Sequence, residues 1–217
     1  MKKLAFAVII AGIALLAYPV AKEYFYDREQ NELLEEIESD FASERPRSSL
    51  GAEYERLARV FDEAARQEET EETPSENPPE ELDGPAIAVI EIDKIDLKLP
   101  VLEGATNANM KVGAAHMIET APLGEAGNAA IAAHRARTKG RQFNRLNEVE
   151  IGDRIDIRLR NGAVSYVVNE IKIVEPTDLS VLESKGDATM LTLITCEPMG
   201  NPTHRLIVHA VKADDPA

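Results

Sequence analysis

The segment MLTLITC (residues 190–196) is an apolar, β-branched run that ends in the only cysteine of the chain. Its length, its alternation and its threonine and isoleucine content predict a half-buried β-strand. The next segment, EPMGNP (residues 197–202), ends that strand, because proline cannot donate to a β-ladder and glycine and asparagine favour turns. The thiol of Cys196 is therefore expected at the C-terminal end of a strand, where a loop begins.

The strand alone leaves two interpretations of Cys196. A free cysteine in a core strand is commonly a small buried hydrophobe. A reactive thiol instead needs an accessible, electropositive setting, which one strand cannot establish. Because the chain holds a single cysteine, no intramolecular disulfide can form. Outside the cytoplasm that thiol would be open to oxidation although it stabilises the fold by no disulfide.

Composition limits the classes of function. The 217 residues predict one domain with appendages, and an apolar content of 44% is enough for a hydrophobic core. A net charge of −15 argues against nucleic-acid binding, which needs clustered lysine and arginine to contact phosphates. One cysteine and scattered histidines lack the ligand spacing of a usual metal site. We therefore expect no cofactor and no nucleic-acid partner, and the scattered acids leave calcium dependence open.

The first 25 residues have the pattern of a membrane anchor. Lys2 and Lys3 precede a stretch without charge from Leu4 to Val20, which fits a short membrane span or a signal peptide. No small-x-small cleavage site follows, and tyrosines and a phenylalanine flank the exit as an interfacial belt. We predict an uncleaved signal anchor over residues 1–25, with a cytoplasmic N-terminus and the rest of the chain extracellular. A cleaved signal peptide is the alternative.

Three further segments follow before the C-terminal tail. Residues 26–67 show helical periodicity and predict a helical stalk, either solvated or docked as an arm on the domain. The second apolar run in this stalk consists of Tyr54, Leu57, Val60, Phe61 and Ala64. Residues 68–85 are acidic and proline-rich, which predicts a disordered linker. Residues 86–213 form the predicted globular domain, and residues 214–217 a tail.

The globular domain is predicted to be all-β. The dipeptide Asn161-Gly162 between alternating apolar runs is a strong hairpin signal. Seven or eight short strands with little helix predict a closed β-barrel of about 125 residues. The runs that carry this prediction are residues 87–92, 95–101, 128–133, 154–159, 164–174, 190–196 and 204–211.

Two basic side chains are candidate partners for Cys196. His134 follows an apolar strand and precedes a basic loop, so its setting parallels that of the cysteine. Arg205 follows the turn-rich loop after Cys196, and an antiparallel return would bring it near the thiol. A guanidinium there can favour the thiolate or donate to a developing oxyanion. Of the other histidines, His209 is expected to be structural, and His116 fits either a core or a site.

These motifs resemble those of sortases, the membrane-anchored cysteine transpeptidases of mostly Gram-positive bacteria. TLITCEP (residues 192–198) followed by RLIV (residues 205–208) is similar to the TLxTC…R signature of that family. His134-Arg135 matches the family histidine, although Ala133 replaces the usual preceding glycine. Further matches are GAAH (113–116), GEAGN (124–128), FNRL (143–146) and GD (152–153). The resemblance covers about residues 86–211 and implies a closed eight-stranded sortase β-barrel with short helices.

The resemblance also implies roles for individual residues. Cys196 would be the nucleophile, His134 the general acid and base, and Arg205 the group that positions the substrate and its oxyanion. We assign substrate binding to Thr195, Arg135 and His116. The substrate would carry an LPxTG-like C-terminal sorting signal. The acyl group would pass from a Cys196 thioester to an amine of lipid II, peptidoglycan or a pilin-type protein.

Several points stay open at the level of sequence. No hydrophobic segment follows Val211 and no Asp-Pro-aromatic lid lies within residues 73–85, so a class D-like sortase is favoured, with class A or a lidless class C as alternatives. A cysteine endopeptidase or a non-catalytic, membrane-tethered peptide-binding barrel would be other functions. Productive chemistry needs a Cys196 thiolate and a protonated His134, so activity should be bell-shaped in pH.

Overall fold

The computed structural model describes residues 24–35, 37, 54, 57–61, 84–138 and 141–213. Most of the predicted anchor, the linker over residues 68–83 and the tail therefore lie outside the described residues. Within the described part of the chain, no helix is both long and apolar enough to cross a membrane.

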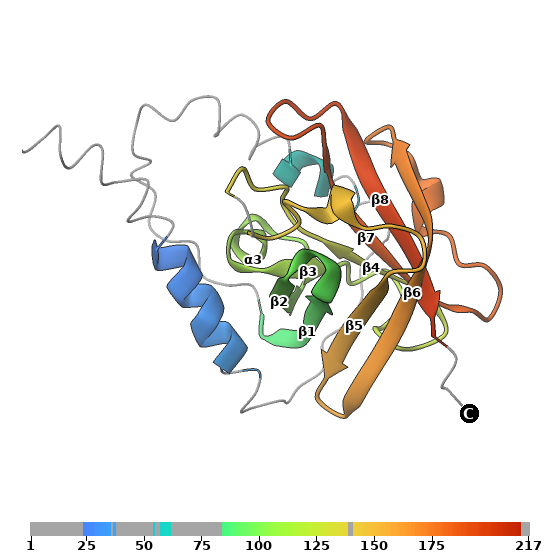
Figure 1. The fold of residues 1–217 in the computed structure, drawn as a ribbon, viewed down its shortest axis with the longest axis horizontal. Helices are drawn as coiled ribbons and strands as arrows, with labels where there is room; N and C mark the ends of the chain where they lie inside the picture. Colours follow the sequence, from blue (N-terminus) through green and yellow to red (C-terminus); the bar gives the residue numbers. More distant parts are fainter. Residues whose placement is uncertain are drawn as a thin grey trace, which may run out of the picture.

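Residues 86–212 form a closed eight-stranded barrel, as predicted (Figure 1). The strands lie around the barrel in the order β1-β2-β3-β4-β7-β8-β6-β5. Their bounds are β1 (Ala86–Ile92), β2 (Leu97–Glu103), β3 (Ala114–His116), β4 (Gly127–Ala132), β5 (Arg154–Leu159), β6 (Gly162–Val174), β7 (Thr189–Glu197) and β8 (His204–Lys212). The short helices are η1 (Asp93–Ile95), α3 (Asn107–Val112), η2 (Leu146–Glu148) and η3 (Leu179–Leu182). Strand β3 has only three residues, which is too short for a periodic pattern to predict.

Strand pairing brings two distant strand ends to one rim of the barrel. The predicted hairpin joins β5 to β6, but its two loop residues are Arg160 and Asn161, since Gly162 already pairs with Leu159 as the first residue of β6. Strand β8 returns antiparallel along β7. Strand β4 pairs in parallel with β7, with Ala132 opposite Ile194. Because parallel strands run in the same direction, β4 and β7 end side by side. The loops that follow these two strands therefore begin next to each other.

Strand β7 differs from its prediction in burial. One face carries Leu191 and Leu193 into the barrel interior, where all eight strands contribute apolar side chains. The other face carries Ile194 and Cys196 into a second apolar cluster outside the barrel. The predicted half-buried strand is thus buried on both faces, since α3, η3 and the helical residues 54 and 57–61 cover its outer face.

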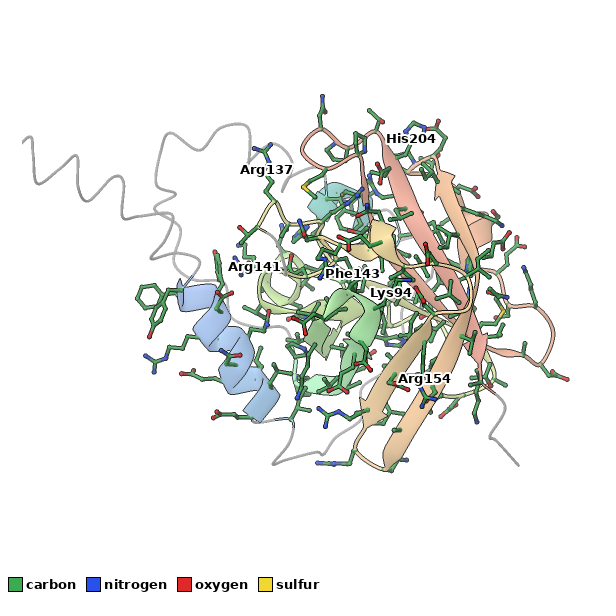
Figure 2. All side chains as sticks on the ribbon, in the orientation of Figure 1. Lys94, Arg137, Arg141, Phe143, Arg154 and His204 are labelled. Carbon is green, nitrogen blue, oxygen red and sulfur yellow. The ribbon has the colours of Figure 1, made fainter. Side chains whose placement is uncertain are left out.

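The segments predicted as a stalk pack against the barrel. The helix over residues 24–35 lies alongside β1, β2 and α3 (blue in Figure 1). Its Leu33 is 7% exposed and contacts Leu102 and Val112. An ion pair of 3.2 Å joins Asp27 to Arg141, which lies on the loop after β4 (Figure 2). For the described residues, these contacts favour the docked arm over the solvated stalk.

Candidate active site

Cys196 and Arg205 face each other across two antiparallel strands. They are paired residues in the register of β7 and β8. Directly opposed residues of antiparallel strands point to the same face, with Cβ atoms about 4.5–5.5 Å apart. The antiparallel return predicted for residues 197–204 therefore occurs and places Arg205 opposite Cys196 on one face of the sheet. Cys196 is 8% exposed and Arg205 is 2% exposed, so both are shielded from water in this conformation.

His134 reaches the same face through the pairing of β4 with β7. The amide of Ala133 donates a hydrogen bond of 3.2 Å to the carbonyl of Ile194, which extends the ladder to the residue before His134. The hydroxyl of Thr195 donates to the carbonyl of Ala133 at 2.8 Å. The amide of Phe143 then donates to the carbonyl of His134 at 3.0 Å and closes the loop. Backbone hydrogen bonds thus hold both sides of His134.

Phe61 lies between His134 and Arg205. Its ring meets the imidazole edge to face with 5.7 Å between centroids. The Arg205 guanidinium carbon lies 4.9 Å from the centroid of the same ring. Phe61 is 1% exposed, and Tyr54, Leu57 and Val60 of the same segment are buried with it in the cluster that contains Cys196. A residue of the predicted stalk therefore occupies the space between two of the candidate catalytic side chains.

The covered site disfavours a charged histidine. Burial lowers the pKa of His134 to about 4, and the positive charge of Lys111 adds to the decrease. Desolvation has this direction because a buried imidazolium loses its hydration. In this conformation His134 is therefore neutral near pH 7. The protonated form that the bell-shaped pH expectation needs is a minor species while Phe61 covers the ring.

Arg135 and Glu197 form an ion pair at the same rim. The Arg135 Nη1 atom donates to the Glu197 carboxylate and, at 3.4 Å, to the carbonyl of Cys196. The two side chains are 8% and 24% exposed. Arg135 follows His134 and Glu197 follows Cys196 in the sequence, so this pair joins the loop after β4 to the last residue of β7.

The family is decided by a match over the barrel. The family model described as Sortase domain matches residues 90–213. The chain belongs to the sortase family. Members of this family are cysteine transpeptidases, and the single cysteine of the chain, Cys196, is the residue before the last of β7, within the matched region.

Two curated relatives and one solved structure illustrate the similarity. Sortase D of Bacillus subtilis (strain 168) is 30% identical over 129 residues, which are 58% of this chain and 63% of the relative. Sortase A of Listeria monocytogenes is 31% identical over 121 residues, 56% of this chain and 54% of the relative. A Clostridium perfringens sortase D5 transpeptidase superposes with a TM-score of 0.56 at 28% identity, covering 74% of this chain and 99% of that one. The matched part thus spans less than two thirds of these curated relatives, and a class D-like sortase is consistent with the matches.

Thr195 and His116, two of the predicted substrate-binding residues, make hydrogen bonds within the barrel in this structure. Thr195 is fully buried and tethers the backbone before His134 through its hydroxyl. His116 is 4% exposed, with Nδ1 3.0 Å from the Glu103 carboxylate and Nε2 3.0 Å from the carbonyl of Ala121. His116 also lies opposite Ile131 of β4, back along the strand from His134. The contacts of both side chains in this structure are internal, and their roles in substrate binding stay predictions.

A buried polar network under the loop between β6 and β7 was not predicted in full. His209 is structural, as expected, with Nδ1 2.9 Å from the Thr192 hydroxyl, and burial lowers its pKa. Thr192 donates to the Asn128 side chain at 2.7 Å, and that amide donates to the carbonyls of Val181 and Glu183. The polar side chain of Thr192 within an otherwise apolar strand was the feature of the sequence that could have indicated this network. Among the described residues, no cluster of three or more His, Cys, Asp or Glu side chains could hold a metal ion.

Proposed function

We propose that this chain is a membrane-anchored sortase that cleaves an LPxTG-like sorting signal and transfers the acyl group to an amine acceptor. The observation that carries the proposal is the cross-strand pair of Cys196 and Arg205 at the rim where β4 delivers His134. Nucleophile, base and oxyanion donor are the three parts that acyl transfer through a thioester needs.

The proposed reaction has two halves. The Cys196 thiolate attacks the carbonyl carbon of the signal threonine, and the Arg205 guanidinium donates to the oxygen that becomes negative. His134 gives its proton to the leaving amine as the peptide bond breaks, which leaves a thioester on Cys196. An acceptor amine then attacks the thioester and gives a proton to His134, and Cys196 leaves as the thiolate. The residues return to their starting ionisation states.

The proposal also names the source of the acceptor amine and the location of the protein. The amine comes from lipid II, peptidoglycan or a pilin-type protein. Residues 1–25 anchor the chain in the cell membrane by a single pass, with a cytoplasmic N-terminus and an extracellular barrel; the charge pattern of this segment supports that orientation. Protease added to intact protoplasts is expected to digest the barrel, and protection of the barrel would contradict the orientation.

The test uses the full chain purified in detergent with a fluorogenic LPxTG-type peptide, with and without an amine acceptor. Acceptor-dependent formation of a ligated product is expected. Cysteine-dependent cleavage without ligation would indicate an endopeptidase, and peptide binding without cleavage a non-catalytic barrel. Cys196→Ala should abolish turnover, while Arg154→Ala, on an exposed ion pair of β5, should retain it. Wild-type activity in Cys196→Ala would refute the mechanism.

A further inference from the structure

One guanidinium connects the loop after β4, which begins next to His134, to the end of β7, which carries Cys196. Arg135 Nη1 contacts both the backbone carbonyl of Cys196 and the side chain of Glu197. The Arg135 side chain is 8% exposed, so this pair is more shielded than an ordinary surface ion pair such as Arg154 with Asp156, where the exposures are 65% and 31%. Exposed pairs contribute little, whereas removing one partner of a shielded pair leaves an uncompensated charge.

The loop after β4 is also fixed to the loop after β7 at a second point. The side-chain amide of Asn144 donates to the carbonyl of Ala136 and lies 3.9 Å from the sulfur of Met199. Arg135 is the member of this junction that contacts the residue bearing the thiol. It therefore adds a side-chain contact to the hydrogen bonds of Ala133 and Thr195 that hold the end of β7 against the residues after β4.

The Glu197 carboxylate links the charge of Arg135 to the ionisation of the Cys196 thiol. A carboxylate one residue from a cysteine disfavours the thiolate, because like charges repel when they are poorly solvated. Arg135 compensates that carboxylate through the ion pair. The charged or titratable groups around Cys196 are Arg205 of β8, His134 and Arg135 after β4, Glu197 of β7, Tyr54 of the covering segment, Lys111 of α3, whose charge acts on His134, and Asp178 before η3, whose charge acts on Tyr54.

We propose that Arg135 is a positioning residue of the sortase reaction, acting through Cys196 and Glu197 rather than by binding the sorting signal. It holds the end of β7 against the start of the His134 loop, and it offsets the Glu197 carboxylate beside the nucleophile. This role rests on the proposed function of Cys196 as the nucleophile. It replaces, for Arg135, the substrate-binding role that the sequence suggested.

Alkylation of Cys196 by iodoacetamide tests the charge effect without any substrate. In full-length Arg135→Gln, the unpaired Glu197 should move the alkylation-pH profile upward by about one unit, which means about tenfold slower alkylation near neutral pH. Glu197→Gln should move the profile downward. The double variant Arg135→Gln/Glu197→Gln should lie close to the wild type, and Arg135→Lys should lie between wild type and Arg135→Gln.

Turnover then separates positioning from substrate binding. For Arg135→Gln we expect a loss of about tenfold in kcat with little change in KM, and recovery in the double variant. Arg154→Gln, on the exposed pair, should leave both measurements unchanged. An unmoved alkylation profile, a change confined to KM, or equal profiles for Arg135→Gln and the double variant would each overturn the proposal. The alkylation result stands even if the sorting signal is misassigned, whereas failure of the proposed function shows as wild-type turnover in Cys196→Ala.

Discussion

Phe61→Ala is expected to activate the enzyme. The ring lies between the imidazole of His134 and the guanidinium of Arg205, with 5.7 Å and 4.9 Å to its centroid. A peptide carbonyl attacked by Cys196 has to approach Arg205 from this same face, so the ring and a substrate compete for one space. Truncating the ring should weaken the docking of residues 54 and 57–61 and make the site available more often.

The size of the effect follows from the burial of Phe61. Replacing a fully buried phenylalanine by alanine costs about 3–5 kcal/mol, and the lost cation–π contact adds about 0.5–2 kcal/mol. Each loss of about 1.4 kcal/mol in docking raises the uncovered fraction about tenfold until that form dominates. Apparent affinity scales with the competent fraction, so kcat/KM should rise at least about tenfold. The pKa of His134 should also rise from about 4, because the ring that desolvates it is gone.

The assay is peptide cleavage and ligation by the full chain, with the melting temperature measured in parallel. Leu33→Ala is the matched control, since Leu33 is a buried apolar residue of the other N-terminal helix and contacts Leu102 and Val112 away from the site. Leu33→Ala should lower stability without raising activity. An unchanged or lower kcat/KM in Phe61→Ala, with the barrel still folded, would refute the reasoning.

Two further predictions concern pH and the loop between β6 and β7. Since the folded pKa of His134, about 4, lies below its ordinary value of about 6.5, the unfolded chain binds more protons between these values, so stability should decrease as the pH is lowered from about 6.5 to about 4. Urea unfolding from pH 7 to pH 4 should show about 3 kcal/mol more loss in wild type than in His134→Asn; parallel losses would contradict this. Asn128→Ala removes contacts to Thr192, Val181 and Glu183 and should cost about 2–3 kcal/mol. Its hydrogen exchange over residues 179–184 should accelerate, and unchanged exchange would exclude a tethering role.

The barrel was predictable because its determinants are local. Alternating apolar runs and the Asn161-Gly162 turn specify strands and one hairpin. The turn-rich segment after Cys196 specifies a return, which fixes Arg205 opposite the thiol. The placement of His134 depends on parallel pairing between β4 and β7, which no local pattern encodes. The resemblance to sortases identified His134 as the partner of Cys196, which the periodicity of the sequence could not do.

The cover over the site could not be predicted, although its apolar residues could be found. Helical spacing shows that Tyr54, Leu57, Val60 and Phe61 share a face, but it does not show which surface receives that face. The ion pair of Arg135 with Glu197 could not be predicted from the sequence for a related reason. Each residue follows a candidate catalytic residue in sequence, and only the register of the two strands shows that the side chains meet.

The alternation of side chains along β7 decides whether a substrate can reach the thiol of Cys196. Leu191 and Leu193 point into the barrel, so the alternation places Cys196 on the outer face with Ile194. A shift of one residue would exchange the two faces and enclose the thiol among interior side chains. On the outer face, Cys196 can be exposed by movement of the segments that cover it, among them residues 54 and 57–61, while the ladder beneath stays paired. A removable cover over an intact barrel can therefore control the reactivity of Cys196 while the rest of the site keeps its geometry.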